Sequence, residues 1–249
     1  MECPTITITF GDQAENHVGM QKIGQLADSG FSLEDLSQAH KYFSDKGYVC
    51  ELINLGDGLP SDISGEEAYV LIVRNGCSHW VNPDDFIAEQ LMLDWDTKAK
   101  MRGRVVNKRA RYNLCYAHTN QDPDYLQGKG RIISFSDVPL LSTIRNGLST
   151  VLGTKAAYLM AEGNLYYDPA KCYIGYHGDS ERRKVIAVRL GSSMPLYYQW
   201  YFQTKSIGKR MKFILHHGDL YIMSSKAVGF DWKKRSITTL RHAAGVKNE

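Results

Sequence analysis

The residues with the clearest chemical potential are His177 and Asp179, which flank Gly178 in the C-terminal half of the chain. Side chains two positions apart on a strand point to the same side, so one imidazole and one carboxylate would face one point in space. Such a pair supplies two of the three ligands of a two-histidine, one-carboxylate site, which holds Fe(II) and leaves coordination positions open. An isolated H-x-D occurs by chance in many chains, so the surrounding sequence decides its meaning.

Length and composition indicate a folded globular protein. The 249 residues are 43% hydrophobic and 23% charged, which are ordinary values for such a protein. No apolar run approaches the roughly 20 residues that span a bilayer, and the first residues resemble no secretory signal. Five scattered cysteines without C-x-x-C spacing favour reduced thiols over disulfides or zinc. We therefore expect an intracellular protein, cytoplasmic or nuclear, with no membrane partner; its oligomeric state stays open.

Positive charge is concentrated in one stretch, although the formal net charge is only +3. Residues 98–111 include seven basic side chains and no acidic one. Arg102 and Arg104 would share one face if residues 102–106 form a strand. Such a run is either a solvated face or a surface that neutralises phosphates. The candidates for binding nucleic acid are Arg102, Arg104, Lys108, Arg109 and Arg111.

The first part of the chain, residues 1–98, has the patterns of an α+β portion. Residues 4–10 alternate threonine with apolar residues, as a strand does. Ser32 and Asp35 resemble a capping box for a helix that continues to about Lys46. Pro83, N-capped by Asn82, predicts a second helix to about Lys98. Strands are expected at 48–55 and 67–73, and this portion can share one core with the rest.

Residues 99–249 are expected to be rich in strands. A strand over 111–116, a polar loop over 117–130 and a helix from Pro139 to about Leu152 come first. Short strands separated by turns then follow at 157–167, 172–177, 184–190, 196–203, 211–216, 219–224 and 235–241. Many short strands favour two packed sheets. The predicted fold class is α+β, with a double-stranded β-helix (jelly roll) core, an N-terminal α+β portion and supporting helices.

Several motifs occur in a fixed order between residues 109 and 245. Asn164-Leu165-Tyr166 precedes the H-x-D motif, with thirteen residues from Asn164 to His177. A strand-like run ending in Leu190-Gly191, a Gly218-Asp219 turn and an R-x5-R pair, Arg235 and Arg241, follow it. In this order the motifs resemble the AlkB-like 2-oxoglutarate/Fe(II) dioxygenases. The first 95 residues carry no motif of that family.

The resemblance implies an enzyme that uses Fe(II), with 2-oxoglutarate and O2 as co-substrates, to hydroxylate or oxidatively demethylate a nucleobase in DNA or RNA. The metal would be held by His177, Asp179 and a second histidine. Asn164 and Tyr166 would hydrogen-bond the 2-oxoglutarate. Its distal carboxylate would pair with Arg235 and Arg241, because arginine binds carboxylates in a bidentate way. A protein side chain or a small molecule stays open as the substrate, since a fold does not choose one.

The second histidine departs from the family pattern. The stretch 221–234, in which the family places it, contains no histidine. His242 could close the triad, although it would face away from its neighbour Arg241. His216 and His217, just before the Gly-Asp turn, are alternatives. If none of them is a ligand, the chain is a catalytically degenerate jelly-roll module that binds nucleic acid or a protein partner.

The sequence also contains a histidine with no assigned chemistry. His17 lies in the glycine-bounded segment 11–19, which reads as a loop. Loops often carry function, but no partner for this side chain is evident, so we interpret it as a residue of a structural turn.

Overall fold

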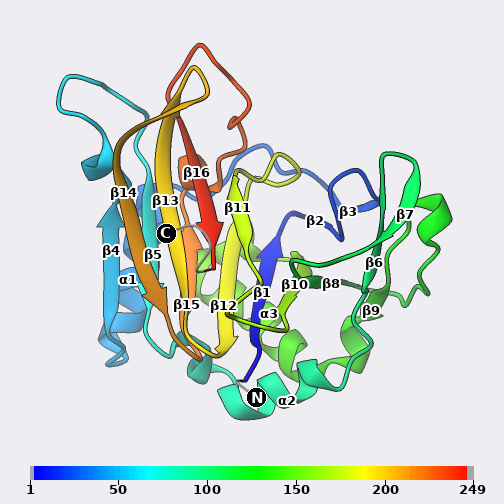
Figure 1. The fold of residues 1–249 in the computed structure, drawn as a ribbon. Coiled ribbons are helices and arrows are strands. Elements are labelled where there is room, and N and C mark those ends of the chain that lie inside the picture. The colour runs from blue at the N-terminus through cyan, green and yellow to red at the C-terminus, as the bar shows by residue number, and fades with distance from the viewer. Residues whose placement is uncertain (1–2, 246–249) are drawn as a thin grey trace.

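The computed structural model describes residues 3–245, which form two β-sheets with helices along one side (Figure 1). The larger sheet has eight strands in the order β4 (Cys50–Asn54), β5 (Tyr69–Val73), β15 (Leu220–Met223), β12 (Val185–Gly191), β1 (Thr5–Gly11), β10 (Met160–Tyr166), β8 (Tyr112–Ala117) and β9 (Ile132–Ser134). The smaller sheet has four, in the order β11 (Ile174–His177), β16 (Thr239–Ala244), β13 (Met194–Phe202) and β14 (Lys205–Leu215). The pairs are antiparallel except β8 with β9. The predicted α+β class is thereby confirmed.

The remaining elements are two short hairpins and four α-helices among the described residues. The hairpins join β2 (Gln13–Glu15) to β3 (Lys22–Gly24) and β6 (Lys98–Met101) to β7 (Arg104–Asn107). The helices are α1 (Leu33–Asp45), α2 (Pro83–Leu91), α3 (Pro139–Leu152) and α4 (Ser225–Val228). Within residues 3–245, no helix combines the length and the apolarity that crossing a membrane requires.

The first strand, β1, lies in the middle of the larger sheet, between β12 and β10. Its alternating sequence explains this place, because Ile6, Ile8 and Phe10 join the core on the helix side while its threonines face the other way. Thr7 therefore lies opposite Arg189 of β12 and Asn164 of β10. A segment of the 1–98 portion thus completes a sheet built largely from 99–249. The division of the chain between these two portions stays a prediction.

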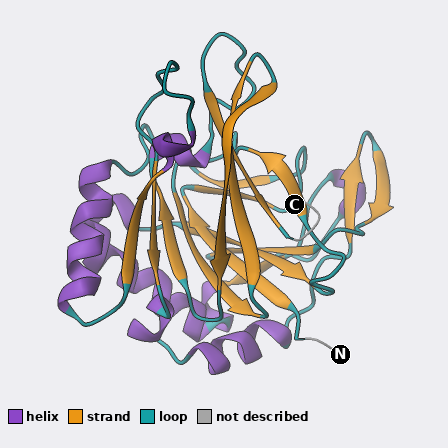
Figure 2. Ribbon diagram, turned by 60° about the vertical axis from the view of Figure 1, so that its left-hand side comes forward, coloured by secondary structure: helices purple, strands orange, loops and turns teal. Residues whose placement is uncertain are grey.

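The two faces of the larger sheet have different coverings. Helices α1, α2 and α3 cover one face, as Figure 2 shows, and bury side chains such as Phe43, Phe86 and Ile144 there. The opposite face packs on the smaller sheet, where Ala187 and Tyr221 share a core with Trp200 and Leu240. Side chains in the space between the two sheets are therefore shielded from water.

The expected helix starts are found, but one helix end is wrong. The capping box of α1 is present, since Ser32 Oγ accepts from Asp35 N at 3.2 Å and the Asp35 carboxylate accepts from Ser32 N at 2.7 Å. Helix α3 has the predicted bounds. Helix α2, however, ends at Leu91 and does not reach Lys98. The chain turns there because the Trp95 indole N–H donates to the Gln90 carbonyl oxygen at 3.0 Å.

The expected strand over 102–106 is also wrong. Arg102 and Gly103 have φ angles of 48° and 78° and form the turn between β6 and β7. Glycine readily adopts such a conformation and so favours a turn at this point. Arg102 therefore does not share a strand face with Arg104.

The central place of β1 gives a stability prediction. Ile8 is fully buried, so Ile8→Ala should lower the free energy of unfolding by about 2–5 kcal/mol, as other buried large-to-small changes do. Urea denaturation measures this loss. Val49→Ala is the control, because Val49 is 66% exposed and its truncation should change stability by less than about 0.5 kcal/mol. Equal midpoints for both variants would contradict the packing of β1.

Candidate metal centre

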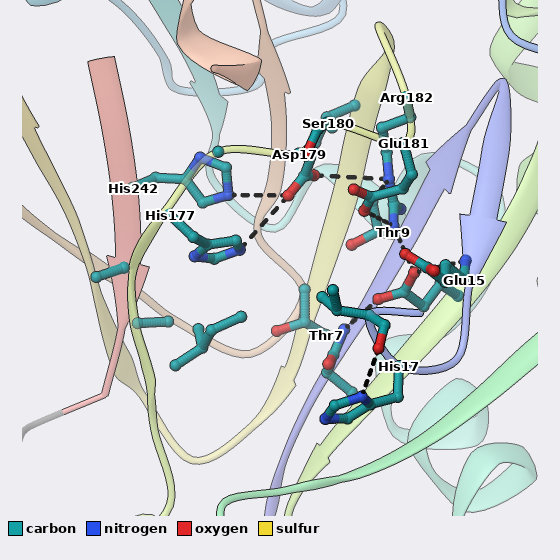
Figure 3. A pocket seen from close by; sticks show the side chains of 18 of the residues that line it. Thr7, Thr9, Glu15, His17, His177, Asp179, Ser180, Glu181, Arg182 and His242 are labelled. Atoms are coloured by element: carbon teal, nitrogen blue, oxygen red, sulfur yellow. Dashed lines mark hydrogen bonds and ion pairs between the residues drawn. The ribbon is translucent and has the colours of Figure 1, made fainter. Parts of the chain in front are cut away.

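Three side chains that could bind a metal converge where β11 and β16 pair. His177 of β11 lies directly opposite His242 of β16, and Asp179 follows two residues after His177. Asp179 Oδ1 is 3.4 Å from His177 Nε2 and 3.5 Å from His242 Nε2. One ligand atom from each residue lies within 4.8 Å of the other two, and Figure 3 shows both imidazoles directed at the carboxylate. The structure thus unites the predicted H-x-D pair with His242.

The other two histidines considered as ligands lie elsewhere. His216 and His217 occupy the turn between β14 and β15 and have partners of their own. His216 Nδ1 is 2.7 Å from Ser193 Oγ, and His217 Nδ1 accepts from Gly191 N at 2.9 Å. Neither belongs to the group of three potential ligands.

Gly178 lets the backbone between the first two ligands pass close to the segment that contains Gly229 and Trp232. A Cβ atom at this position would lie 2.1 Å from the carbonyl oxygen of Gly229 and 2.8 Å from Trp232 Cβ. The close approach also lets Asp179 N donate to Val228 O at 3.0 Å. The backbone therefore fixes the carboxylate between the imidazoles.

The hydrogen bonds leave the histidines in the state that metal binding needs. His177 Nδ1 is 2.8 Å from Gly175 O; a carbonyl only accepts, so Nδ1 carries the proton and the Nε2 lone pair faces Asp179. Burial, followed by the neighbouring His177, lowers the pKa of His242 and keeps its ring neutral. Atoms bound at right angles about 2.1 Å from one ion lie about 3 Å apart, close to the separations seen here. This donor set fits a divalent first-row metal such as Fe(II).

A buried arginine balances the charge of the carboxylate. The Arg182 guanidinium, 2% exposed, contacts Glu162, Glu181 at 2.8 Å and Asp179 at 3.6 Å. Burial opposes ionisation of Asp179, but the Arg182 guanidinium outweighs it and holds the pKa of Asp179 well below its usual range. Asp179 is therefore an anionic ligand at neutral pH.

A cavity of about 440 Å³ adjoins the three ligands and reaches across the inner face of the larger sheet. Asn164 and Tyr166, predicted to contact the co-substrate, both line it. Asn164 Oδ1 accepts from Arg111 Nε and from Asn113 Nδ2, each at 2.7 Å. The amide of Asn164 is thus held in one orientation in the cavity wall.

The two arginines predicted to bind the co-substrate lie outside the cavity lining. Strand β16 begins only at Thr239, so Arg235 lies in the exposed loop before it. The Arg241 guanidinium lies 3.9 Å from the centre of the Tyr201 ring and 5.1 Å from that of Trp232. Adjacent residues of a strand face opposite ways, so Arg241 points away from the cavity that His242 faces. The strand expected over 235–241 therefore begins too early, and Arg235 and Arg241 do not lie on one strand.

The cavity instead contains an arginine that the sequence analysis did not select. Arg189 of β12 is 1% exposed and lines the cavity beside Thr7. Its Nε and Nη1 atoms have no hydrogen-bond partner among the described residues, although Tyr221 hydrogen-bonds to the guanidinium. An unpaired buried cation is costly. The sequence contains a signal that could have identified Arg189, because it is the one charge in the apolar run 185–191. Charged residues are rarely fully buried without a partner, so a charge within a buried strand indicates a binding role.

The basic run divides into an exposed part and an inward part. Arg102, Arg104 and Arg109 are exposed on and after the β6–β7 hairpin, which projects from the body in Figure 1. Lys108 Nζ donates to Asn16 Oδ1 at 2.7 Å, and burial lowers its pKa to about 8. Arg111 turns toward Asn164. Among the five residues predicted to bind nucleic acid, the exposed ones are therefore Arg102, Arg104 and Arg109.

Comparison with known proteins gives a viral relative. An uncharacterized protein of Acanthamoeba polyphaga mimivirus is 52% identical over 243 residues, which cover 97% of this chain and 95% of the viral protein. No family model matches the chain.

The geometry predicts which histidine completes the metal site. A ligand that binds only the folded state stabilises it by about 2.7 kcal/mol at a hundredfold excess over its dissociation constant. Anaerobic Fe(II) should therefore raise the melting temperature of the wild type and of His217→Ala, and should leave that of His242→Ala nearly unchanged. Differential scanning fluorimetry under nitrogen measures these shifts. An equal gain in both variants would exclude His242 as a ligand.

Proposed function

The chain belongs to one protein family with this mimivirus protein, and we propose that it is an Fe(II)- and 2-oxoglutarate-dependent dioxygenase of the AlkB-like kind that oxidises a nucleobase in DNA or RNA. One observation carries the proposal. His177, Asp179 and His242 converge at a cavity that also contains a buried arginine with unpaired donors. A metal site and an anion site in one enclosed space are what a metal-chelating dicarboxylate requires.

The strand order supports a jelly roll as the core of this enzyme. From β10 onward the chain crosses between the sheets at every step except the β13–β14 hairpin, with β10, β12 and β15 in the larger sheet and β11, β13, β14 and β16 in the smaller one. Strand β1 fills the place between β10 and β12. Seven strands in chain order with an eighth from the N-terminus therefore form two facing sheets, as in a double-stranded β-helix.

The proposed metal site uses residues from one end of the smaller sheet. Bound Fe(II) would supply the redox chemistry that couples breakdown of 2-oxoglutarate by O2 to oxidation of a C–H bond. The three protein ligands leave the cavity side of the site open. Arg182 holds Asp179 ionised, and the Gly175 carbonyl oxygen holds the His177 ring in place.

Arg189 is the residue that we assign to the distal carboxylate of 2-oxoglutarate, in place of Arg235 and Arg241. Its Nε and Nη1 atoms are free to donate charge-assisted hydrogen bonds to carboxylate oxygens. The pairing would also remove the cost of two unsatisfied buried donors. Asn164, Tyr166 and Thr7 offer neutral hydrogen-bonding groups from the neighbouring strands.

Nucleic acid as the substrate is supported by the exposed part of the basic run. Arg102, Arg104 and Arg109 can contact phosphates without reading sequence. A target base would have to be single-stranded or flipped to enter the cavity. The alternative of a catalytically degenerate binding module was motivated by the lack of an evident third ligand. His242 lies beside His177 and Asp179 and can fill that role.

Conversion of 2-oxoglutarate to succinate tests this function even without the true substrate. The purified protein with Fe(II), O2 and ascorbate should form succinate slowly. Arg189→Leu should raise the KM for 2-oxoglutarate at least about tenfold, because a charged hydrogen-bonded pair contributes about 1.5–3 kcal/mol. Arg235→Ala serves as the matched control and should leave the KM unchanged. No succinate from the wild type, or a KM shift in Arg235→Ala alone, would contradict the assignment.

A further inference from the structure

The cavity has a second side, formed by the β2–β3 hairpin, that the metal and co-substrate do not use. Glu15, Asn16 and His17 of this hairpin line the cavity together with the three metal ligands. Figure 3 shows Glu15 and His17 across the open space from His177 and Asp179. His17, expected to be a turn residue, thus faces the space into which a substrate would enter.

The hydrogen bonding of His17 fixes what it can offer. Its Nδ1 lies 3.1 Å from the carbonyl oxygen of Val18, which can only accept, so Nδ1 carries the proton. In the neutral ring Nε2 is then an acceptor, and no described residue donates to it. Burial lowers the pKa of His17, and the charges of Lys108 and Arg111 lower it further. The ring is therefore neutral near pH 7 and offers one lone pair.

Glu15 adds a second acceptor on the same side of the cavity. Its Oε1 atom accepts from Gly19 N at 2.8 Å, while no described residue donates to Oε2. The substrate side thus offers two hydrogen-bond acceptors, the Nε2 atom of His17 and the Oε2 atom of Glu15.

The hairpin that carries these groups is held in place. Asn16 Nδ2 donates to Asp96 Oδ2 at 2.8 Å, and Lys108 Nζ donates to Asn16 Oδ1 at 2.7 Å. Gln21 N donates to Gly128 O at 2.8 Å. Acceptors fixed before binding discriminate better than mobile ones, because less order is lost when a ligand binds.

The charges near His17 do not call for a cationic ligand. Lys108 and Arg111 act on His17, and Lys22 acts on Glu15. These basic groups offset the carboxylate of Glu15, so a neutral N–H group can bind beside His17. A carbonyl oxygen there would face the lone pair of Nε2 and leave it unpaired, which costs more than a missing contact.

We propose that His17, assisted by Glu15, is a specificity-determining residue that selects a neutral base carrying an exocyclic amino group over its oxo counterpart. Cytosine presents an amino group where uracil presents a carbonyl oxygen, and adenine differs from hypoxanthine in the same way. This inference rests on the proposed function, since it names the bases that the same cavity accepts.

The test compares two single strands that differ in one base, which carries an amino group in cytosine and an oxo group, with a proton on N3, in uracil. Short fluorescein-labelled oligonucleotides with a central deoxycytidine or deoxyuridine are titrated anaerobically into protein loaded with Fe(II) and 2-oxoglutarate, and anisotropy is measured. The wild type should bind the deoxycytidine strand about tenfold more tightly, as expected when one acceptor in the site is paired by cytosine and left unpaired by uracil. His17→Phe should abolish the preference, and His17→Asn, which keeps an acceptor oxygen, should retain part of it. His118→Phe, a matched change outside the cavity, should leave the preference intact.

The outcomes separate this inference from the proposed function. Succinate formation with equal affinity for both strands, or no affinity for either, would overturn the inference alone. A preference that persists in His17→Phe would also overturn it. Absence of succinate would overturn the proposed function, and the same titration of metal-free protein would still reveal whether His17 discriminates.

Discussion

The antiparallel pairing of β11 with β16 is the constraint on which the site depends. It sets His177 opposite His242, although 65 positions of sequence separate them. A shift of the register by one residue would bring Arg241 or Ala243 to the position of His242 and turn the imidazole to the other face. Gly178 then returns the chain closely enough for Asp179 to complete the group. One strand pair and one glycine therefore determine the three-ligand geometry.

The space between the sheets holds more buried charge than a structural core needs. Arg182 forms ion pairs with Glu162, Glu181 and Asp179. Arg189 lies in the same cavity, and its Nε and Nη1 donors have no hydrogen-bond partner among the described residues. A hydrophobic replacement of such groups is often as stable as the ion pairs themselves. Their presence beside an open cavity supports the proposal that this space binds ligands: a metal at one end, an anion at Arg189 and a donor-bearing base at His17.

The sequence was most informative where a pattern was local. The capping box at Ser32, the start of α3 at Pro139 and the alternation in β1 each depend on neighbouring residues, and each matches the structure. The H-x-D motif was likewise local, and His177 and Asp179 lie side by side, although β11 ends at His177 and Asp179 follows the strand instead of belonging to it.

What the sequence could not show depended on contacts between distant segments. Spacing left the third ligand undecided among His216, His217 and His242, because only the β11–β16 register places His242 beside His177. The arginine pair was chosen from a family spacing, yet β16 starts too late to include Arg235. Arg189 faces the cavity because β1 inserts beside β12, a pairing between segments almost the whole chain apart. The position of His17 in the cavity depends on the β2–β3 hairpin, which lies across from His177 and Asp179.

The most direct measurement is the visible absorption spectrum of the protein titrated with Fe(II) and then with 2-oxoglutarate in the absence of oxygen. A 2-oxo acid that chelates Fe(II) gives a weak charge-transfer band, which neither component gives alone. The account predicts this band in the wild type and its loss in His242→Ala. If the wild type gives no band at saturating Fe(II) and 2-oxoglutarate, the three residues do not form such a centre and the central claim is wrong.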